Sequence, residues 1–415
     1  MPVGALVIGA GLSGLAAAYR LARAGEKVVV LEARDRVGGR AWRLDAGGLP
    51  FDAGCEAVDR VHTSLLGLAN ELGVPTWETE PWAAHLERDL PAVLRALEEE
   101  IAGLAERVDP RHPQELEGAG ALDEQTLAGR LEELGASEQE LAEAEVQYAV
   151  ASSSVPIREM SLLAYATKLA AGAAPTGLTI RLEGGPSALA ERLAAGLDVR
   201  FGAEAVASAE GGDGVRVRLR DGREVRARRA VVALPLTVQR GIEFDPPLPE
   251  HRRLALSRAR YGDAVKAALA YDEQRARGLP HLSADGVLYQ PDPRIPLLAL
   301  FAAAGAAQRA RELVFHEHKL PSAAERSSGA EGHVLLSCAG GTQALLAAVD
   351  WTAERHTGGS YLVFGLGDLT TWGRRLEEPR GRLHFAGSEA SELPSYMEGA
   401  VRAGERAADE ALAAG

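Results

Sequence analysis

Cysteine is scarce in this chain. The 415 residues contain two, Cys55 and Cys338, which lie far apart and lack metal-ligand spacing. This excludes a disulfide framework and a cysteine-based zinc site, predicts no metal, and fits a protein of the reducing cytoplasm. Long hydrophobic runs are lacking as well. The longest, residues 295–307, is too short to span a bilayer. Because the chain ends soon after its last predicted helix, we also expect no C-terminal anchor.

Positive charge is in the minority. Lys and Arg number 45 against 59 Asp and Glu, which leaves a net charge of −14. A surface with this excess of negative charge repels polyanions, so nucleic acid and anionic membranes are excluded as partners. The apolar N-terminus lacks the basic segment of a signal peptide. With 46% apolar residues, the chain can bury a large core and predicts two domains.

The N-terminal residues carry a complete dinucleotide-binding pattern. An apolar strand over residues 3–8 leads into Gly9, Gly11 and Gly14, the glycines of a G-x-G-x-x-G motif. Gly9 permits a tight turn, Gly11 lets a pyrophosphate approach the backbone, and Gly14 lets the next helix pack on the sheet. The N-terminus of that helix offers free N–H groups to the phosphates. Glu32 ends the second strand, close to the ~20-residue spacing of the motif, where its carboxylate can accept hydrogen bonds from ribose hydroxyls.

A second pair of glycines indicates which dinucleotide is bound. Gly38, Gly39 and Arg40 follow the acidic end of the second strand. This Gly-Gly-Arg resembles the flavoprotein version of the motif, in which the glycines again approach the pyrophosphate and the arginine lies nearby. We therefore expect FAD rather than NAD. The structural alternative is a Rossmann-like unit without a ligand.

The middle of the chain predicts a helical insertion over residues 80–175. Apolar residues recur at steps of three and four from Leu86 to Val108, which is one face of a helix with Pro91 in its first turn. Residues 109–124 are rich in Pro, Gly and acids and are interpreted as a loop. A capping box precedes a further helix at Ser137, and residues 161–171 are interpreted as helical.

Strand patterns follow the insertion. Residues 215–227 alternate apolar side chains with arginines around an Asp-Gly turn, which predicts a hairpin whose arginines face solvent. A buried strand is expected over residues 230–234. Further strands are expected over 261–271, 286–300 and 333–339, a short helix around 343–354, and a helix or loop over 302–332.

The C-terminal stretch carries a family resemblance. Residues 382–391 read RLHFAGSEAS, and residues 394–408 read PSYMEGAVRAGERAA. Together with the N-terminal motifs, they closely resemble the FAD-dependent amine oxidases, which include monoamine, polyamine and L-amino acid oxidases. The chain is identified as a short, soluble, bacterial-type member. The resemblance covers residues 1–75, 177–270 and 355–415 and is weak in the helical insertion.

The resemblance implies an α/β fold with two domains. A Rossmann-like FAD-binding domain is expected from residues 1–79, 177–248 and 358–415. A substrate domain with a mixed sheet plus helices is expected from residues 80–176 and 249–357. The implied reaction oxidises the C–N bond of a small-molecule amine to an imine and reduces O2 to H2O2. The oligomeric assembly that we expect is a homodimer.

The resemblance also implies catalytic residues. Lys266 matches a lysine near flavin N5, usually linked to it through a water. In a chain with four lysines, one in an apolar strand needs a partner or a task, unless its ammonium simply reaches solvent. Tyr361 and Tyr396 match two aromatic residues that flank the substrate amine. Ser360 stands where some members have a cysteine bonded to the flavin; serine cannot form that thioether, so we expect non-covalent FAD.

Further cofactor-binding residues are implied by the matching motifs. Val206 matches a residue whose backbone holds the adenine, and a helix that starts at Gly399 would direct its N-terminus to the pyrimidine oxygens of the flavin. The rest of this set is Ser13, Ala33, Arg34, Gly387, Ser388, Glu389, Met397 and Ala400.

One segment departs from the family pattern. Cys55 and Glu56 stand where the family has a glycine-rich and aromatic run, so they are unfamiliar candidates for the site wall. No arginine for a substrate carboxylate can be identified, which leaves the amine open. Two alternatives remain: a desaturase or protoporphyrinogen-type oxidase with an apolar substrate, and a flavin-binding protein without turnover. Lys266 and the tyrosine pair argue against the first, and nothing positive supports the second.

Overall fold

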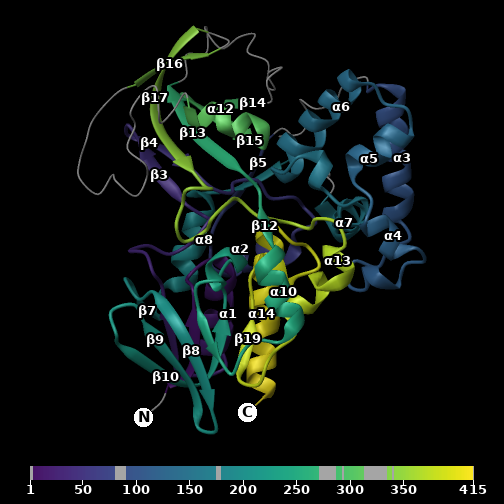
Figure 1. Ribbon diagram of the computed structural model, residues 1–415. Coiled ribbons are helices and arrows are strands. Elements are labelled where there is room, and N and C mark those ends of the chain that lie inside the picture. Colours follow the sequence, from purple (N-terminus) through teal and green to yellow (C-terminus); the bar gives the residue numbers. More distant parts are fainter. Residues whose placement is uncertain are drawn as a thin grey trace.

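The structure is a computed structural model that describes residues 3–79, 90–173, 179–270, 287–291, 294–312, 334–338 and 341–414. Figure 1 shows three parts: an eight-stranded sheet at the bottom with two long helices beside it, a five-stranded sheet at the upper left, and a group of helices at the upper right. The expected α/β class is confirmed.

The eight-stranded sheet aligns the ends of its parallel strands. Its order is β11-β8-β9-β10-β1-β2-β7, and β19 also pairs with β10. In the register, Ile8 lies opposite both Leu31 and Val232, and Val232 lies opposite Phe385. Four parallel strands therefore end at one edge, where open α/β sheets bind their ligands. The strands are β1 Val3–Ile8, β2 Val28–Leu31, β7 Asp198–Arg200, β8 Ala205–Gly211, β9 Gly214–Leu219, β10 Glu224–Val232, β11 Glu243–Asp245 and β19 Leu383–Phe385.

Two helices from opposite ends of the chain pack against each other on this sheet. They are α1 (Leu12–Arg23) and α14 (Met397–Ala413). A Cβ on Gly404 would overlap the carbonyl oxygen of Ser13, so the two backbones can approach this closely only because residue 404 is glycine. The helix expected to begin at Gly399 begins two residues earlier, at Met397.

The predicted hairpin is present, with one correction. β9 and β10 pair antiparallel around Asp221-Gly222, and the three alternating arginines from Arg216 to Arg220 are exposed. The strand expected over residues 230–234 is not separate, because β10 runs unbroken to Val232. Its first half pairs with β9 and its second half joins the parallel strands on both sides.

The five-stranded sheet is antiparallel, in the order β14-β15-β13-β17-β16. The helix expected around residues 343–354 is wrong, because residues 341–350 form a strand whose Leu345, Ala347 and Ala348 are buried. A continuous apolar run has no period that separates a buried strand from a buried helix. The stretch 286–300 likewise contains parts of two strands. The strands are β13 Ala264–Ala270, β14 Val287–Pro291, β15 Leu297–Ala303, β16 Val334–Cys338 and β17 Gly341–Asp350.

The helical insertion forms its own core. Leu94, Leu97, Ile101 and Leu104 are at most 3% exposed, as their spacing predicts; Leu86 lies outside the described residues. The capping box at Ser137 is present. The loop expected over residues 109–124 is partly wrong, since it contains α4. The helices here are α3 Ala92–Ala105, α4 Ala119–Asp123, α5 Leu127–Glu133, α6 Glu138–Ala144 and α7 Leu162–Lys168.

Shorter elements connect the three parts. They are β3 Arg43–Ala46, β4 Leu49–Asp52, β5 Thr76–Thr79, β6 Thr179–Leu182, β12 Arg260–Tyr261, β18 Leu362–Val363, α2 Thr63–Glu71, α8 Gly185–Ala194, α9 Leu236–Gln239, α10 Glu250–Arg258, α12 Gly305–Arg311 and α13 Asp368–Thr371. Of the stretch 302–332, α12 is helical and residues 313–332 lie outside the described part. No helix among the described residues is long and apolar enough to cross a bilayer. The domain boundaries stay a prediction.

Candidate active site

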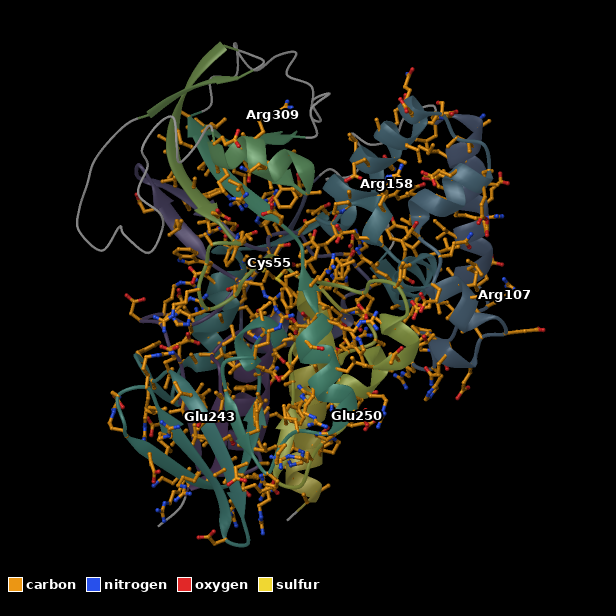
Figure 2. All side chains as sticks on the ribbon, viewed as in Figure 1. Cys55, Arg107, Arg158, Glu243, Glu250 and Arg309 are labelled. Atoms are coloured by element: carbon orange, nitrogen blue, oxygen red, sulfur yellow. The ribbon has the colours of Figure 1, made fainter. Side chains whose placement is uncertain are left out.

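A long cavity lies at the carboxyl edge of the parallel strands. It passes from the ends of β1 and β2 to the five-stranded sheet, and it is lined by residues from both ends of the chain. Cys55, one of these lining residues, lies near the centre of the molecule in Figure 2. Of the predicted site residues, all but Gly14, Val206 and the wall candidate Glu56 line this cavity; their roles stay predictions.

The end of the cavity near β1 and β2 has the chemistry of a dinucleotide site. Glu32 is 4% exposed, and its two carboxylate oxygens accept hydrogen bonds from the backbone N–H groups of Ala10 and Arg34 at 2.8 and 3.0 Å. These bonds hold a negative charge at the end of β2. A Cβ on Gly11 would meet no atom within 4 Å, whereas one on Gly14 would overlap the Gly9 carbonyl oxygen. Gly11 therefore faces open space, and Gly14 serves helix packing.

The C-terminal motif meets the N-terminal motif in this cavity. The Gly387 N–H donates to Ser13 Oγ at 2.8 Å. Arg40 donates to the Glu389 carboxylate at 2.9 Å and to the Ser360 carbonyl at 2.8 Å. Segments more than 300 residues apart in the sequence are thereby held together around one space.

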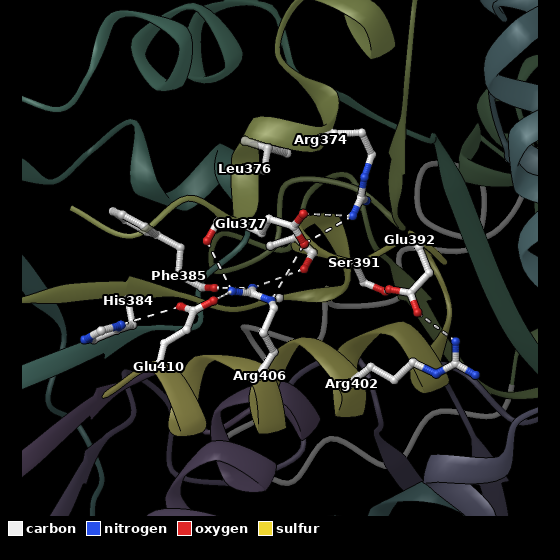
Figure 3. Close-up of polar contacts among 12 residues, drawn as sticks. Arg374, Leu376, Glu377, His384, Phe385, Ser391, Glu392, Arg402, Arg406 and Glu410 are labelled. Atoms are coloured by element: carbon white, nitrogen blue, oxygen red, sulfur yellow. Dashed lines mark hydrogen bonds and ion pairs between the residues drawn. The ribbon is translucent and has the colours of Figure 1, made fainter. Parts of the chain in front are cut away.

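An arginine network supports the C-terminal motif from behind. Arg406 of α14 donates to the carbonyls of Phe385 and Ala390 at 2.8 and 3.2 Å, and it also pairs with Glu410 (Figure 3). These bonds tie the segment between β19 and α14 to the helix. Arg406 was not predicted as a support, although it lies within the C-terminal motif at residues 394–408.

Lys266 lies at the centre of the five-stranded sheet and is 6% exposed. It is therefore not the solvent-reaching lysine of the alternative interpretation. Its Nζ donates to the Gly54 carbonyl at 3.0 Å and to Glu56 Oε2 at 2.9 Å. Glu56 also pairs with Arg181 at 3.2 Å. Burial alone would raise the pKa of Glu56, but Lys266 and then Arg181 lower it to about 2.

Cys55 and Glu56 take different positions. Cys55 lines the large cavity beside Lys266, whereas Glu56 lines a second, smaller cavity next to Arg181. Burial, followed by the charge of Asp52, raises the pKa of the Cys55 thiol to about 12. The thiol is therefore protonated at neutral pH and is a poor nucleophile.

Tyr361 and Tyr396 both line the cavity. Tyr361 accepts a hydrogen bond from Ser154 Oγ at 2.9 Å, and Tyr396 donates to the Ala173 carbonyl at 3.4 Å. Burial raises the pKa of both phenols, and each therefore stays neutral at physiological pH. Ser360 is 8% exposed and donates through Oγ to the Gly262 carbonyl at 3.0 Å.

Gly14, Val206 and Glu56 do not line the large cavity, and several residues that line it were not predicted. Val206 does not line the cavity, whereas its neighbour Ala205 does. Val206 was implied by the family resemblance alone, and nothing in the sequence indicates which residue of β8 faces the cavity. Lining residues that were not predicted include Phe301, Trp351, His356, Thr357 and Ser395, which come from separate strands and loops.

These residues fit FAD. Open space at Gly11, the held carboxylate of Glu32 and the start of α14 at Met397 lie along one cavity. They suit in turn a pyrophosphate, a ribose and an electron-rich ring system. The cavity also has aromatic walls, which are formed by Phe301, Trp351, Tyr361 and Tyr396.

Comparison with known proteins agrees with this geometry. Residues 12–412 match the family of flavin containing amine oxidoreductases. The chain is 30% identical to a putative flavin-containing monoamine oxidase, AofH, of Mycobacterium tuberculosis, over 99% of this chain and 97% of the relative. It is 29% identical to human flavin-containing amine oxidase B, over 98% and 85%.

Solved structures show the same similarity. A putrescine oxidase with bound putrescine is 25% identical with a TM-score of 0.82, covering 100% of this chain and 99% of that one. Cyclohexylamine oxidase of Brevibacterium oxydans IH-35A is 26% identical with a TM-score of 0.82, covering 99% of each chain. These findings do not favour a desaturase or a flavin-binding protein without turnover. The chain belongs to the flavin containing amine oxidoreductases and is an FAD-dependent amine oxidase.

Proposed function

We propose that this enzyme transfers the electrons of its amine to O2. The amine loses two electrons and two protons across its C–N bond and becomes an imine, and O2 takes up two electrons and two protons to become H2O2. Water then hydrolyses the imine. When bound, FAD supplies the two-electron carrier between the two reactants. The observation that carries the proposal is the cavity in which Lys266 and two tyrosines adjoin a complete dinucleotide site.

The side chains divide the work. Tyr361 and Tyr396 are proposed to hold the amine between neutral aromatic walls, which orient it without adding charge. Phe301 and Trp351 line the same cavity and favour an amine with a hydrocarbon body, as in a monoamine. Lys266 is proposed to hold a protonated ammonium at the reacting end, where it stabilises negative charge and positions a water. We keep the cytoplasm and a homodimer as predictions.

Anaerobic mixing tests this function. The oxidised holoenzyme is mixed without oxygen with benzylamine, cyclohexylamine and putrescine in turn, and then with an apolar polyene and a porphyrinogen. We expect an amine to bleach the flavin absorption band, and O2 added afterwards to restore it with one H2O2 per flavin. Bleaching only by the polyene or the porphyrinogen would contradict amine oxidation. A band that returns only with an artificial acceptor would contradict the role of O2.

Cofactor attachment is tested separately. Ser360 cannot form a thioether, so acid precipitation of the holoenzyme is expected to release intact FAD into the supernatant. The measurement is the absorption spectrum and mass of the released flavin. Yellow colour that stays in the washed pellet would show a covalent bond and would contradict the proposal.

A further inference from the structure

The Lys266 ammonium lies between two cavities. Lys266 lines the large cavity, and Glu56, its partner at 2.9 Å, lines the small cavity and not the large one. The carboxylate therefore does not line the large cavity itself but contacts the lysine that does. We infer that Glu56 is a positioning residue, which holds the Lys266 ammonium charged and aimed into the cofactor cavity. This inference rests on the role proposed for Lys266.

The hydrogen bonds fix the direction of the ammonium. A lysine ammonium has three donors. Two of them are taken by the Gly54 carbonyl and by Glu56 Oε2, at 3.0 and 2.9 Å. The third is left for the space that Lys266 lines. Because Gly54 and Glu56 belong to one short segment after β4, this segment sets the orientation of the lysine head.

The charges around Lys266 make Glu56 its closest counterion. From the segment after β4, Glu56 faces the ammonium directly and Cys55 lies beside it as a neutral thiol. Arg181 of β6 reaches Glu56 from the other side. Asp52 forms an ion pair with Arg43 at 2.7 Å, so its negative charge is already compensated by that arginine.

Three apolar side chains among the described residues also lie near Lys266. The Phe51 ring lies 5.6 Å from its Nζ. On the flanking strands β15 and β17, the residues opposite Lys266 are Phe301 and Val349. Among the described residues, the nearest negative charge is thus that of Glu56.

Lys266 and its ion-pair partners are buried together. The side chains of Lys266, Arg181 and Glu56 are 7%, 9% and 16% exposed. Burial disfavours the charged form of an amine, and loss of the Glu56 charge would remove the closest counterion of the Lys266 ammonium. Without Glu56, Lys266 would give up its proton more readily.

The low number of lysines makes this measurable. Four lysines yield four side-chain signals in the NMR spectrum of holoenzyme labelled with 13Cε-lysine, and Lys266→Met identifies the signal of Lys266. In Glu56→Gln, the pH midpoint of that signal is expected to fall by about one unit or more relative to wild type. The pH dependence of the flavin absorption spectrum is expected to move with it, while the FAD content stays unchanged. Neither measurement uses amine or O2. The test therefore gives a clear result even if the proposed function is wrong.

Two variants serve as controls. Arg181→Met removes the competing cation and leaves the Lys266–Glu56 pair, so the midpoint is expected to stay or rise. Glu56→Asp keeps the negative charge but shortens the side chain by one methylene. The pH midpoint of the Lys266 signal is expected to lie between those of wild type and Glu56→Gln. An unchanged midpoint in Glu56→Gln would overturn the inference. If Glu56→Gln does not fold, a midpoint in Glu56→Asp that equals the wild-type value overturns it.

Discussion

Lys266→Met is expected to slow steady-state turnover by about 100-fold while FAD stays bound, a loss typical of removing one charged group from a catalytic site. Methionine keeps most of the volume and removes the ammonium. The fold should tolerate the change because Glu56 keeps its second partner, Arg181, at 3.2 Å. The carboxylate is therefore not left as an unpaired buried charge.

The role of this lysine is tested by which of the two half-reactions is slowed. Stopped-flow absorption separates reduction of the enzyme by amine from its reaction with O2, and we expect the second to be slowed more. Lys27→Met is the matched control, because Lys27 is exposed, and it should behave like wild type. Wild-type rates in both half-reactions of Lys266→Met would remove the lysine from the site. A variant that loses FAD or unfolds would indicate a structural role instead.

Gly11→Ala is expected to weaken FAD binding strongly without harming the apoprotein. Gly11 has extended backbone angles (φ −71°, ψ 172°) that alanine adopts readily, and its added methyl group would enter open space in the cavity. With FAD bound, that space is where the pyrophosphate must approach the backbone. An overlap of this kind costs about 1–3 kcal/mol, which is roughly a 5- to 150-fold loss of affinity.

Gly14→Ala is the contrasting variant. Its methyl group would overlap the carbonyl oxygen of Gly9 inside the protein, so the apoprotein itself should lose about 1–3 kcal/mol of stability. The two variants are compared by thermal unfolding of the apoproteins and by FAD titration. If the two variants have the same apoprotein stability and the same loss of FAD affinity, the assignment of Gly11 to the cavity and of Gly14 to the packing interface is wrong.

The parts of the site that were predictable are those encoded by neighbouring residues. Gly9, Gly11 and Glu32 belong to one strand–turn–helix–strand unit. Its residue types are dictated by local requirements: a tight turn, a close backbone approach and a charge at a strand end. The C-terminal motif is likewise contiguous. Such patterns stay readable at low identity, so the family and its cofactor follow from the sequence.

The main error in the predicted fold concerns the alanine-containing strand β17. A short helix was expected around residues 343–354, where residues 344–349 (ALLAAV) are apolar and include three alanines, which favour helices. The strand exists because its neighbours β13 and β16 bond it on both sides. Tertiary packing overrides local propensity at such positions, and one sequence does not show which neighbours will pack there.

By itself, the sequence determined the family, FAD and the presence of an unusual lysine in an apolar strand. Only the tertiary structure decided what that lysine contacts: Lys266 meets Glu56 across 210 positions, and Glu56 meets Arg181 across 125. It also decided that Ala205 rather than Val206 lines the cavity. The physical reason is that an ion pair depends on distance in space. That distance is set when the two sheets and the segment after β4 pack together, and no spacing along the chain encodes it.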